Sequence, residues 1–101
     1  MPATIDAARR THILDGDATG GGHRAGTGKP GKSEFPVNWT DDEVISRVEE
    51  VANDPHSSRR NGRLGRAVVS GTCHGVDIEV VIEANGTQIV TGYPTNIRRN
   101  P

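Results

Sequence analysis

The fold is decided by the stretch Val76-Asp77-Ile78-Glu79-Val80-Val81-Ile82-Glu83-Ala84-Asn85-Gly86-Thr87-Gln88-Ile89-Val90-Thr91-Gly92-Tyr93. Apolar residues recur at every second position of its first half, which predicts a strand over 76–83 with one buried face. Asn85-Gly86 is a strong hairpin signal, so a further strand over 87–93 follows. Ala67 to Thr72 predicts another strand just before this stretch. We therefore expect a three-stranded antiparallel meander in the C-terminal third.

The hairpin loop determines which face of the sheet Thr91 and Tyr93 occupy, because residues two apart in a strand share a face. A two-residue turn at Asn85-Gly86 pairs Val80 with Thr91 and places Thr91 on the apolar face. A three-residue loop with a left-handed glycine pairs Glu79 with Thr91 and places both on the more polar face. The second register is required if Thr91 and Tyr93 are functional.

Helical patterns precede the strands. Thr40 to Asp54 predicts a helix, since Thr40 and Glu43 form a capping box and Pro55 stops the helix. A shorter helix is predicted over 5–14, and a short extended piece over 35–39. Residues 56–65 predict a polar, arginine-rich loop. Helices followed by an antiparallel meander indicate an α+β fold.

The composition fits one small domain, residues 1–101, with an aliphatic core, because hydrophobic residues make up 32% and aromatic residues 3%. The net charge of −1 gives no global sign of nucleic-acid binding. Basic residues nevertheless gather over 9–32 and 59–66, and such clustering can create a positive cleft. Cys73 is the only cysteine, so no internal disulfide exists. We expect no membrane partner, because no apolar run is long enough to span a bilayer and no signal-peptide pattern follows Met1.

Two histidines, His12 and His23, lie 11 residues apart around a glycine-rich segment, and Lys29 and Lys32 follow. Histidine can act as a base or an acid near neutral pH. A lysine can stabilise charge that builds up on phosphate oxygens, and glycines allow the backbone to approach a phosphate closely. These residues alone indicate phosphodiester chemistry, with a glycine-rich binding loop as the open alternative.

Other motifs are weaker. Residues 26–33 match the phosphate-binding loop G-x-x-x-x-G-K-[ST] letter for letter, but no hydrophobic strand precedes them and Pro36 opposes a following helix. The histidines and Cys73 lack metal-ligand spacing, so no metal site is expected. Cys73 has no activating partner in the sequence and is expected to be a buried or turn residue. His56 and His74 are expected to be structural or solvent-exposed.

Taken together, several motifs in one order resemble the bacterial EndoU-type ribonuclease domains, which commonly form the C-terminal toxin tips of polymorphic and contact-dependent inhibition systems. The resemblance covers most of the chain and rests on these segments: residues 12–17, 20–24, 26–36, 39–42, 51–55 and 89–96. It implies a ribonuclease-A-like fold, with helices followed by a curved antiparallel sheet.

The resemblance also implies an active site. Its two histidines match His12 and His23, its lysine matches Lys32 in preference to Lys29, and its C-terminal pair matches Thr91 and Tyr93. Three further residues are expected to bind substrate: Arg24, Lys29 and Ser33. Tyr93 is expected either to contact RNA or only to cap the small core.

The implied reaction is metal-independent cleavage of RNA by attack of the 2′-hydroxyl, which leaves a 2′,3′-cyclic phosphate, and no cofactor is expected. The expected substrate is single-stranded or tRNA-like RNA. The domain would be secreted or delivered as a toxin tip, would act in the target-cell cytoplasm, and would be neutralised by a cognate immunity protein. The alternatives are an inactive member of the fold that binds RNA or protein, and a different toxin or nucleotide-binding module.

Overall fold

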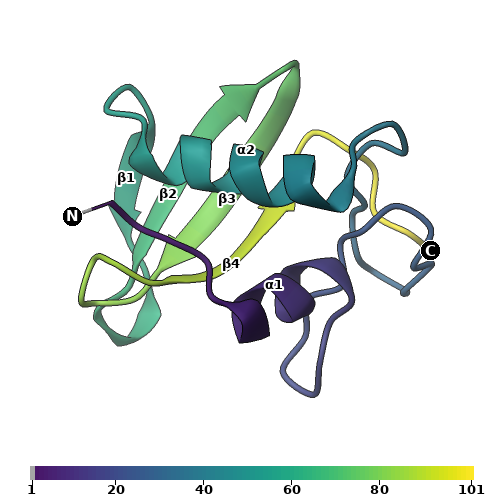
Figure 1. The fold of residues 1–101 in the computed structure, drawn as a ribbon, viewed down its shortest axis with the longest axis horizontal. Helices are drawn as coiled ribbons and strands as arrows, with labels where there is room; N and C mark the ends of the chain where they lie inside the picture. The colour runs from purple at the N-terminus through teal and green to yellow at the C-terminus, as the bar shows by residue number, and fades with distance from the viewer. Residues whose placement is uncertain (1) are drawn as a thin grey trace.

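The computed structural model describes residues 2–101, so Met1, the first residue of the predicted domain, lies outside the described residues. Two helices precede a four-stranded sheet (Figure 1). Their bounds are α1 (Ala7–Leu14), α2 (Asp41–Asn53), β1 (Ser58–Asn61), β2 (Ala67–Cys73), β3 (Val76–Ile82) and β4 (Ile89–Pro94). Neighbouring strands are antiparallel and follow the order β1-β2-β3-β4. The predicted α+β fold class is confirmed.

Helix α2 covers one face of the sheet, as Figure 1 shows. The predicted capping box is present: the Thr40 hydroxyl accepts from the Glu43 amide at 3.1 Å, and the Glu43 carboxylate accepts from the Thr40 amide at 3.0 Å. The helix buries one apolar stripe against the sheet, in which Val48 is 0% exposed. Val48 packs so closely on Gly92 of β4 that a Cβ added to Gly92 would lie 2.6 Å from Cγ1 of Val48. This close packing fixes the distance between α2 and β4.

Helix α1 lies beside β4, at the edge of the sheet opposite β1 (Figure 1). It begins two residues later than predicted, because Asp6 is its N-cap and accepts from the Arg9 amide at 2.8 Å. Its last turn contains His12 and buries Ile13 and Leu14 in the core. No helix among the described residues is long and apolar enough to cross a membrane.

Neither predicted hairpin loop is correct. The Glu83 amide donates to the Gln88 carbonyl at 2.9 Å and closes a loop over 84–87, and Gly86 is left-handed within it (φ 76°). This loop by itself would place Thr91 opposite Val80, on the face that α2 covers. A β-bulge that leaves Val90 unpaired instead brings Thr91 opposite Val81. A one-residue shift exchanges the two faces of a strand.

The bulge therefore places Thr91 and Tyr93 on the face away from α2, as the functional interpretation required. The predicted partner of Thr91 was wrong by two residues, because Glu79 lies opposite Tyr93 and not opposite Thr91.

Two other sequence predictions were wrong. Residues 35–39 form no strand, because the Trp39 amide donates back to the Pro36 carbonyl at 3.0 Å in a turn. Phe35 is buried and stacks on Trp39, whereas Val37 is 90% exposed. The predicted loop over 56–65 contains strand β1 and a 3₁₀ turn over Arg63–Gly65. All four residues of β1 are exposed, so it carries no hydrophobic alternation and forms through backbone pairing with β2.

Candidate active site

The end of helix α1 holds the two histidines together. The last carbonyls of a helix lack partners within the helix. Here the amides of Gly22, His23 and Arg24 donate in turn to the carbonyls of residues 12, 13 and 14, at 2.9, 2.7 and 3.0 Å. The segment that carries His23 is therefore bonded residue by residue to the helical turn that carries His12.

His12 is 6% exposed, and its Nδ1 lies 3.0 Å from Oδ1 of Asp17. The hydroxyl and amide of Thr19 also donate to this oxygen, at 2.6 and 2.9 Å. These hydrogen bonds, with that from His12, lower the pKa of Asp17, so the carboxylate is ionised at neutral pH. Because a carboxylate only accepts hydrogen bonds, His12 Nδ1 carries the proton and Nε2 is the free ring nitrogen.

His23 is 7% exposed, and its Nδ1 lies 2.7 Å from the carbonyl oxygen of Ser33. A carbonyl also only accepts, so here again Nδ1 is the donor and Nε2 is free. Burial lowers the pKa of His23, and the positive charges of Lys32, His12 and Arg99 lower it further, against the opposite effect of the Ser33 carbonyl. His23 is therefore neutral at neutral pH.

Strand β4 contributes the side chains of Thr91 and Tyr93. The Thr91 hydroxyl is buried and has no hydrogen-bond partner among the described residues. The Tyr93 ring centroid lies 5.6 Å from that of His23, and its hydroxyl donates to Glu79 Oε1 at 2.6 Å. Arg60 of β1 also donates to Glu79, at 3.0 Å. Burial and the Glu79 carboxylate raise the pKa of Tyr93 to about 12, so the phenol stays protonated.

The two histidines, Thr91 and Tyr93 meet in one pocket of about 430 Å³. Each of the five residues predicted to be catalytic lines it: His12, His23, Lys32, Thr91 and Tyr93. Arg99 lines it as well, and no aspartate or glutamate is among its lining residues. The pocket is therefore positively charged on a chain whose net charge is −1, and it is of a size that suits a small ligand.

Only one of the three residues predicted to bind substrate lines the pocket. Arg24 pairs with Asp41 at 3.0 Å and with Asp15 at 2.7 Å, and it does not line the pocket. Lys29 also lies outside the lining and packs behind the glycine segment, against Gly22. Ser33 lines the pocket, but its buried hydroxyl donates to the carbonyl of Pro94 at 2.7 Å.

Residues 26–33, which match the phosphate-binding loop motif, have no free backbone amides over their first three residues. The amides of Gly26 and Gly28 each donate to the Glu34 carboxylate, at 2.8 Å. No strand directly precedes the segment, and no helix directly follows it. A carboxylate of the chain itself thus binds these amides, which agrees with the rejection of a nucleotide loop.

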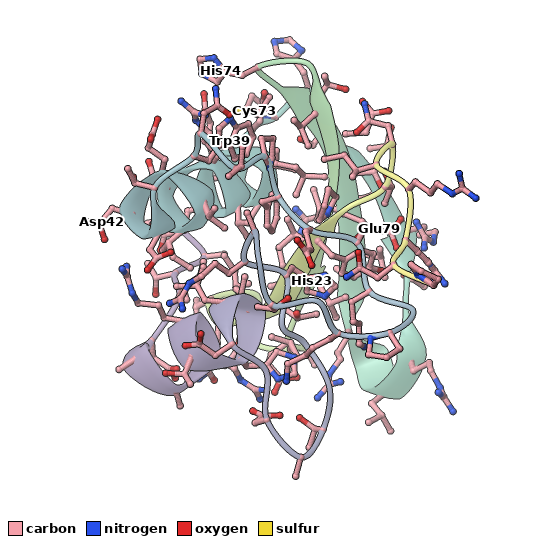
Figure 2. The ribbon with its side chains drawn as sticks, turned by 90° about the vertical axis from the view of Figure 1, so that its right-hand side faces the viewer. His23, Trp39, Asp42, Cys73, His74 and Glu79 are labelled. Carbon is pink, nitrogen blue, oxygen red and sulfur yellow. The ribbon has the colours of Figure 1, made fainter. Side chains whose placement is uncertain are left out.

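The remaining alternatives gain no support from the structure. Among residues 2–101, no group of three or more His, Cys, Asp or Glu side chains could hold a metal ion. Cys73 is 7% exposed, and burial together with the Glu50 carboxylate raises its pKa to about 11. Figure 2 shows Cys73 and His74 at one end of the molecule, whereas His23 lies near its middle with Glu79 on the strand side. Cys73 is thus a buried thiol, as expected, remote from the pocket.

Sequence reasoning missed three residues of the site. Asp17 lies within a quoted motif, but nothing in its spacing shows that it binds His12. Glu79 is an acidic position in an alternating strand, and only the pairing of β3 with β4 reveals its contact with Tyr93. Arg99 follows the last quoted motif, and its only sequence signal is the basic pair Arg98-Arg99.

The fold and the pocket define a class: an α+β protein that places two imidazoles and a lysine around one positively charged pocket. A comparison with protein families matches residues 6–96 to the family described as bacterial EndoU nuclease. The chain belongs to this family of nucleases, and the resemblance noted in the sequence is confirmed. Comparisons with curated proteins and with solved structures give no match.

Proposed function

We propose that the chain is an endoribonuclease that cleaves RNA without a metal ion, by attack of the ribose 2′-hydroxyl on the adjacent phosphate. The observation that carries this proposal is the pocket, in which two imidazoles and a lysine converge without a lining carboxylate. Family membership supports nuclease activity. The chain's own side chains can supply proton transfer and charge stabilisation, which are the needs of this reaction.

The different partners of the two histidines suggest different roles. His23 is neutral and binds a carbonyl, so its free Nε2 is suited to remove the proton of the 2′-hydroxyl. His12 donates through Nδ1 to the Asp17 carboxylate, which fixes the orientation of the ring, so we assign its Nε2 to protonation of the departing 5′-oxygen. The O2′–P bond forms as the P–O5′ bond breaks, and the products are a 2′,3′-cyclic phosphate and a 5′-hydroxyl.

Lys32 and Thr91 would stabilise the transition state. The Lys32 side chain lines the pocket beside Gly20. The buried Thr91 hydroxyl has no partner in the chain and is available to donate to a phosphate oxygen. Tyr93 binds Glu79 through its hydroxyl, so its ring face is the part left to contact a base.

Cleavage of RNA in EDTA tests this proposal. The parent chain and His56→Ala, an exposed histidine outside the pocket, should both release fragments that end in cyclic phosphate. His23→Ala and His12→Ala should each lower the rate by about 100-fold or more. A DNA of the same sequence should stay intact, because it lacks the 2′-hydroxyl. Absence of cleavage by the parent at high concentration would indicate an inactive binding member of the fold, and inhibition by EDTA would refute the metal-independent step.

We further propose that the nuclease acts as an antibacterial toxin domain, delivered into the cytoplasm of a target cell and neutralised by an immunity protein. Family membership and the motif resemblance support this role. Expression inside a bacterium should arrest growth, and His23→Ala should not. If the purified chain cleaves RNA but its expression leaves growth unchanged, the toxin role is wrong and the nuclease proposal stands.

A further inference from the structure

The C-terminal tail forms one wall of the pocket. Ile97 and Arg99 both line it, although the family match ends at residue 96. In Figure 1 the tail leaves β4 and runs beside the loop that carries His23 and Lys32. The pocket is therefore completed by residues that lie beyond the family match.

The tail is attached to the molecule on both sides of Arg99. On one side, Asn96 accepts from the Asp77 amide at 3.0 Å and donates to the Gly75 carbonyl at 3.0 Å. On the other side, the Asn100 amide donates to the Lys32 carbonyl at 2.9 Å, and the Gly31 amide donates to the Asn100 carbonyl at 2.9 Å. These bonds hold the backbone of the tail in place.

The Asn100 side chain strengthens this attachment. It donates to the Lys29 carbonyl at 3.0 Å and to the Glu34 carboxylate at 2.8 Å. Glu34 is the same carboxylate that binds the amides of Gly26 and Gly28. The Glu34 carboxylate therefore binds both the loop and the tail. The backbone on either side of Arg99 is held by hydrogen bonds to the rest of the fold.

The Arg99 guanidinium has no ion-pair partner among the described residues, in contrast to Arg24 and Arg60, which bind carboxylates. Its positive charge contributes to the lowered pKa of His23 and partly opposes the net rise in the pKa of Tyr93. With Lys32, it gives the lining two permanent positive charges and no negative one. A single phosphodiester carries one negative charge, which Lys32 can balance, so the charge of Arg99 is available to a second phosphate.

We propose that Arg99 binds a phosphate that flanks the scissile one, so that the substrate is an RNA longer than a dinucleotide. This proposal rests on the proposed function, in which Lys32 acts at the scissile phosphate. Arginine presents a planar fork of donors that matches phosphate oxygens, and unpaired positive charges at the mouth of a site attract a polyanion.

The test compares Arg99→Gln with Arg98→Gln, which removes the same charge from the adjacent exposed residue outside the pocket. Binding of a 2′-O-methyl oligoribonucleotide, which cannot be cleaved, is measured by fluorescence anisotropy across a range of salt concentrations. Arg99→Gln should weaken binding by about tenfold. It should also reduce the slope of log Kd against log salt by about 0.7, the value for one phosphate contact on a single strand. Arg98→Gln should change neither quantity.

The rate of RNA cleavage is the second measurement in this test. Arg99→Gln should lower kcat/KM for a trinucleotide by about tenfold, and it should leave kcat/KM unchanged for a dinucleoside monophosphate, which has no flanking phosphate. Equal loss on both substrates would place Arg99 at the scissile phosphate and overturn the proposal. Equal binding by Arg99→Gln and the parent, or no binding by the parent, would also overturn it. If the parent binds the oligonucleotide through Arg99 but cleaves no RNA, the proposed function fails and the phosphate contact stands.

Discussion

Gly21 lies where the segment that carries His23 packs directly against the backbone of His12. It has a φ of 78°, and a Cβ added to it would lie 2.0 Å from the His12 carbonyl oxygen and 3.1 Å from the His12 ring carbon Cδ2. No side-chain rotation relieves the first contact, because the oxygen belongs to the backbone. The same oxygen accepts from the Gly22 amide at 2.9 Å, so a shift that admits the Cβ disturbs this bond as well.

The cost of Gly21→Ala has two parts. A left-handed backbone costs a residue with a Cβ about 1–2 kcal/mol. Overpacking that forces the backbone to move costs about 1–3 kcal/mol more. We therefore expect Gly21→Ala to lower the free energy of unfolding by about 2–5 kcal/mol. Gly28→Ala is the matched control, because Gly28 has a φ of 65° and a Cβ there would meet nothing within 4 Å; it should lose only about 1–2 kcal/mol.

Urea unfolding of both variants and the parent measures these differences. Cleavage of RNA, measured where each variant is still folded, shows whether His12 has moved. Gly21→Ala should lose activity beyond its loss of folded protein, whereas Gly28→Ala should keep the parent's kcat. If the two variants are equally stable and equally active, the close approach of Gly21 to His12 does not shape the site, and the reasoning is wrong.

Three further outcomes are expected. Because the pKa of His23 is lowered in the folded chain, the unfolded chain binds a proton at this residue more readily below about pH 6.5. The free energy of unfolding should therefore fall as the pH drops below about 6.5, and it should fall more in the parent than in His23→Gln. The acid limb of the kcat/KM profile should have its midpoint below about pH 6.5 as well. Tyr93 is the only tyrosine, so ultraviolet titration of the phenol should give a midpoint near 12, and Glu79→Gln should lower it; an unchanged midpoint would show that the hydroxyl does not bind Glu79. Cys73→Ser should cleave RNA at the parent's rate, and the thiol should resist alkylation at neutral pH because its pKa is about 11; rapid alkylation of the folded chain would contradict its burial.

The parts of the fold that could be predicted are those encoded by short-range chemistry. Thr40 and Glu43 carry the capping box of α2 in their own side chains, and the alternation over 76–82 records one buried face. Strand β1 could not be predicted, because its four exposed residues leave no apolar pattern. The bulge at Val90 could not be predicted either, since a bulge changes backbone pairing without requiring a particular side chain.

The candidate site was predictable in its residue types and not in its arrangement. The quoted motifs contain all five residues that line the pocket as predicted. The resemblance favours Lys32 over Lys29, but the residue types alone do not separate the two lysines. That distinction depends on which side of the glycine segment each lysine packs. Arg99 was missed because its position depends on the attachment of Asn100 to the loop, which is a contact between residues far apart in sequence.

The proposed roles of the two histidines also could not be predicted from the sequence. Both rings use Nδ1 as a donor and leave Nε2 free, so they differ chiefly in what each Nδ1 binds. The partner of His12 is the Asp17 carboxylate, whereas the partner of His23 is a backbone carbonyl in a buried setting where nearby positive charges favour the neutral ring. Any residue at position 33 would offer that carbonyl, so no residue type there marks His23 as the base. The proposed assignment of base and acid therefore rests on burial and backbone geometry, which the local sequence does not encode.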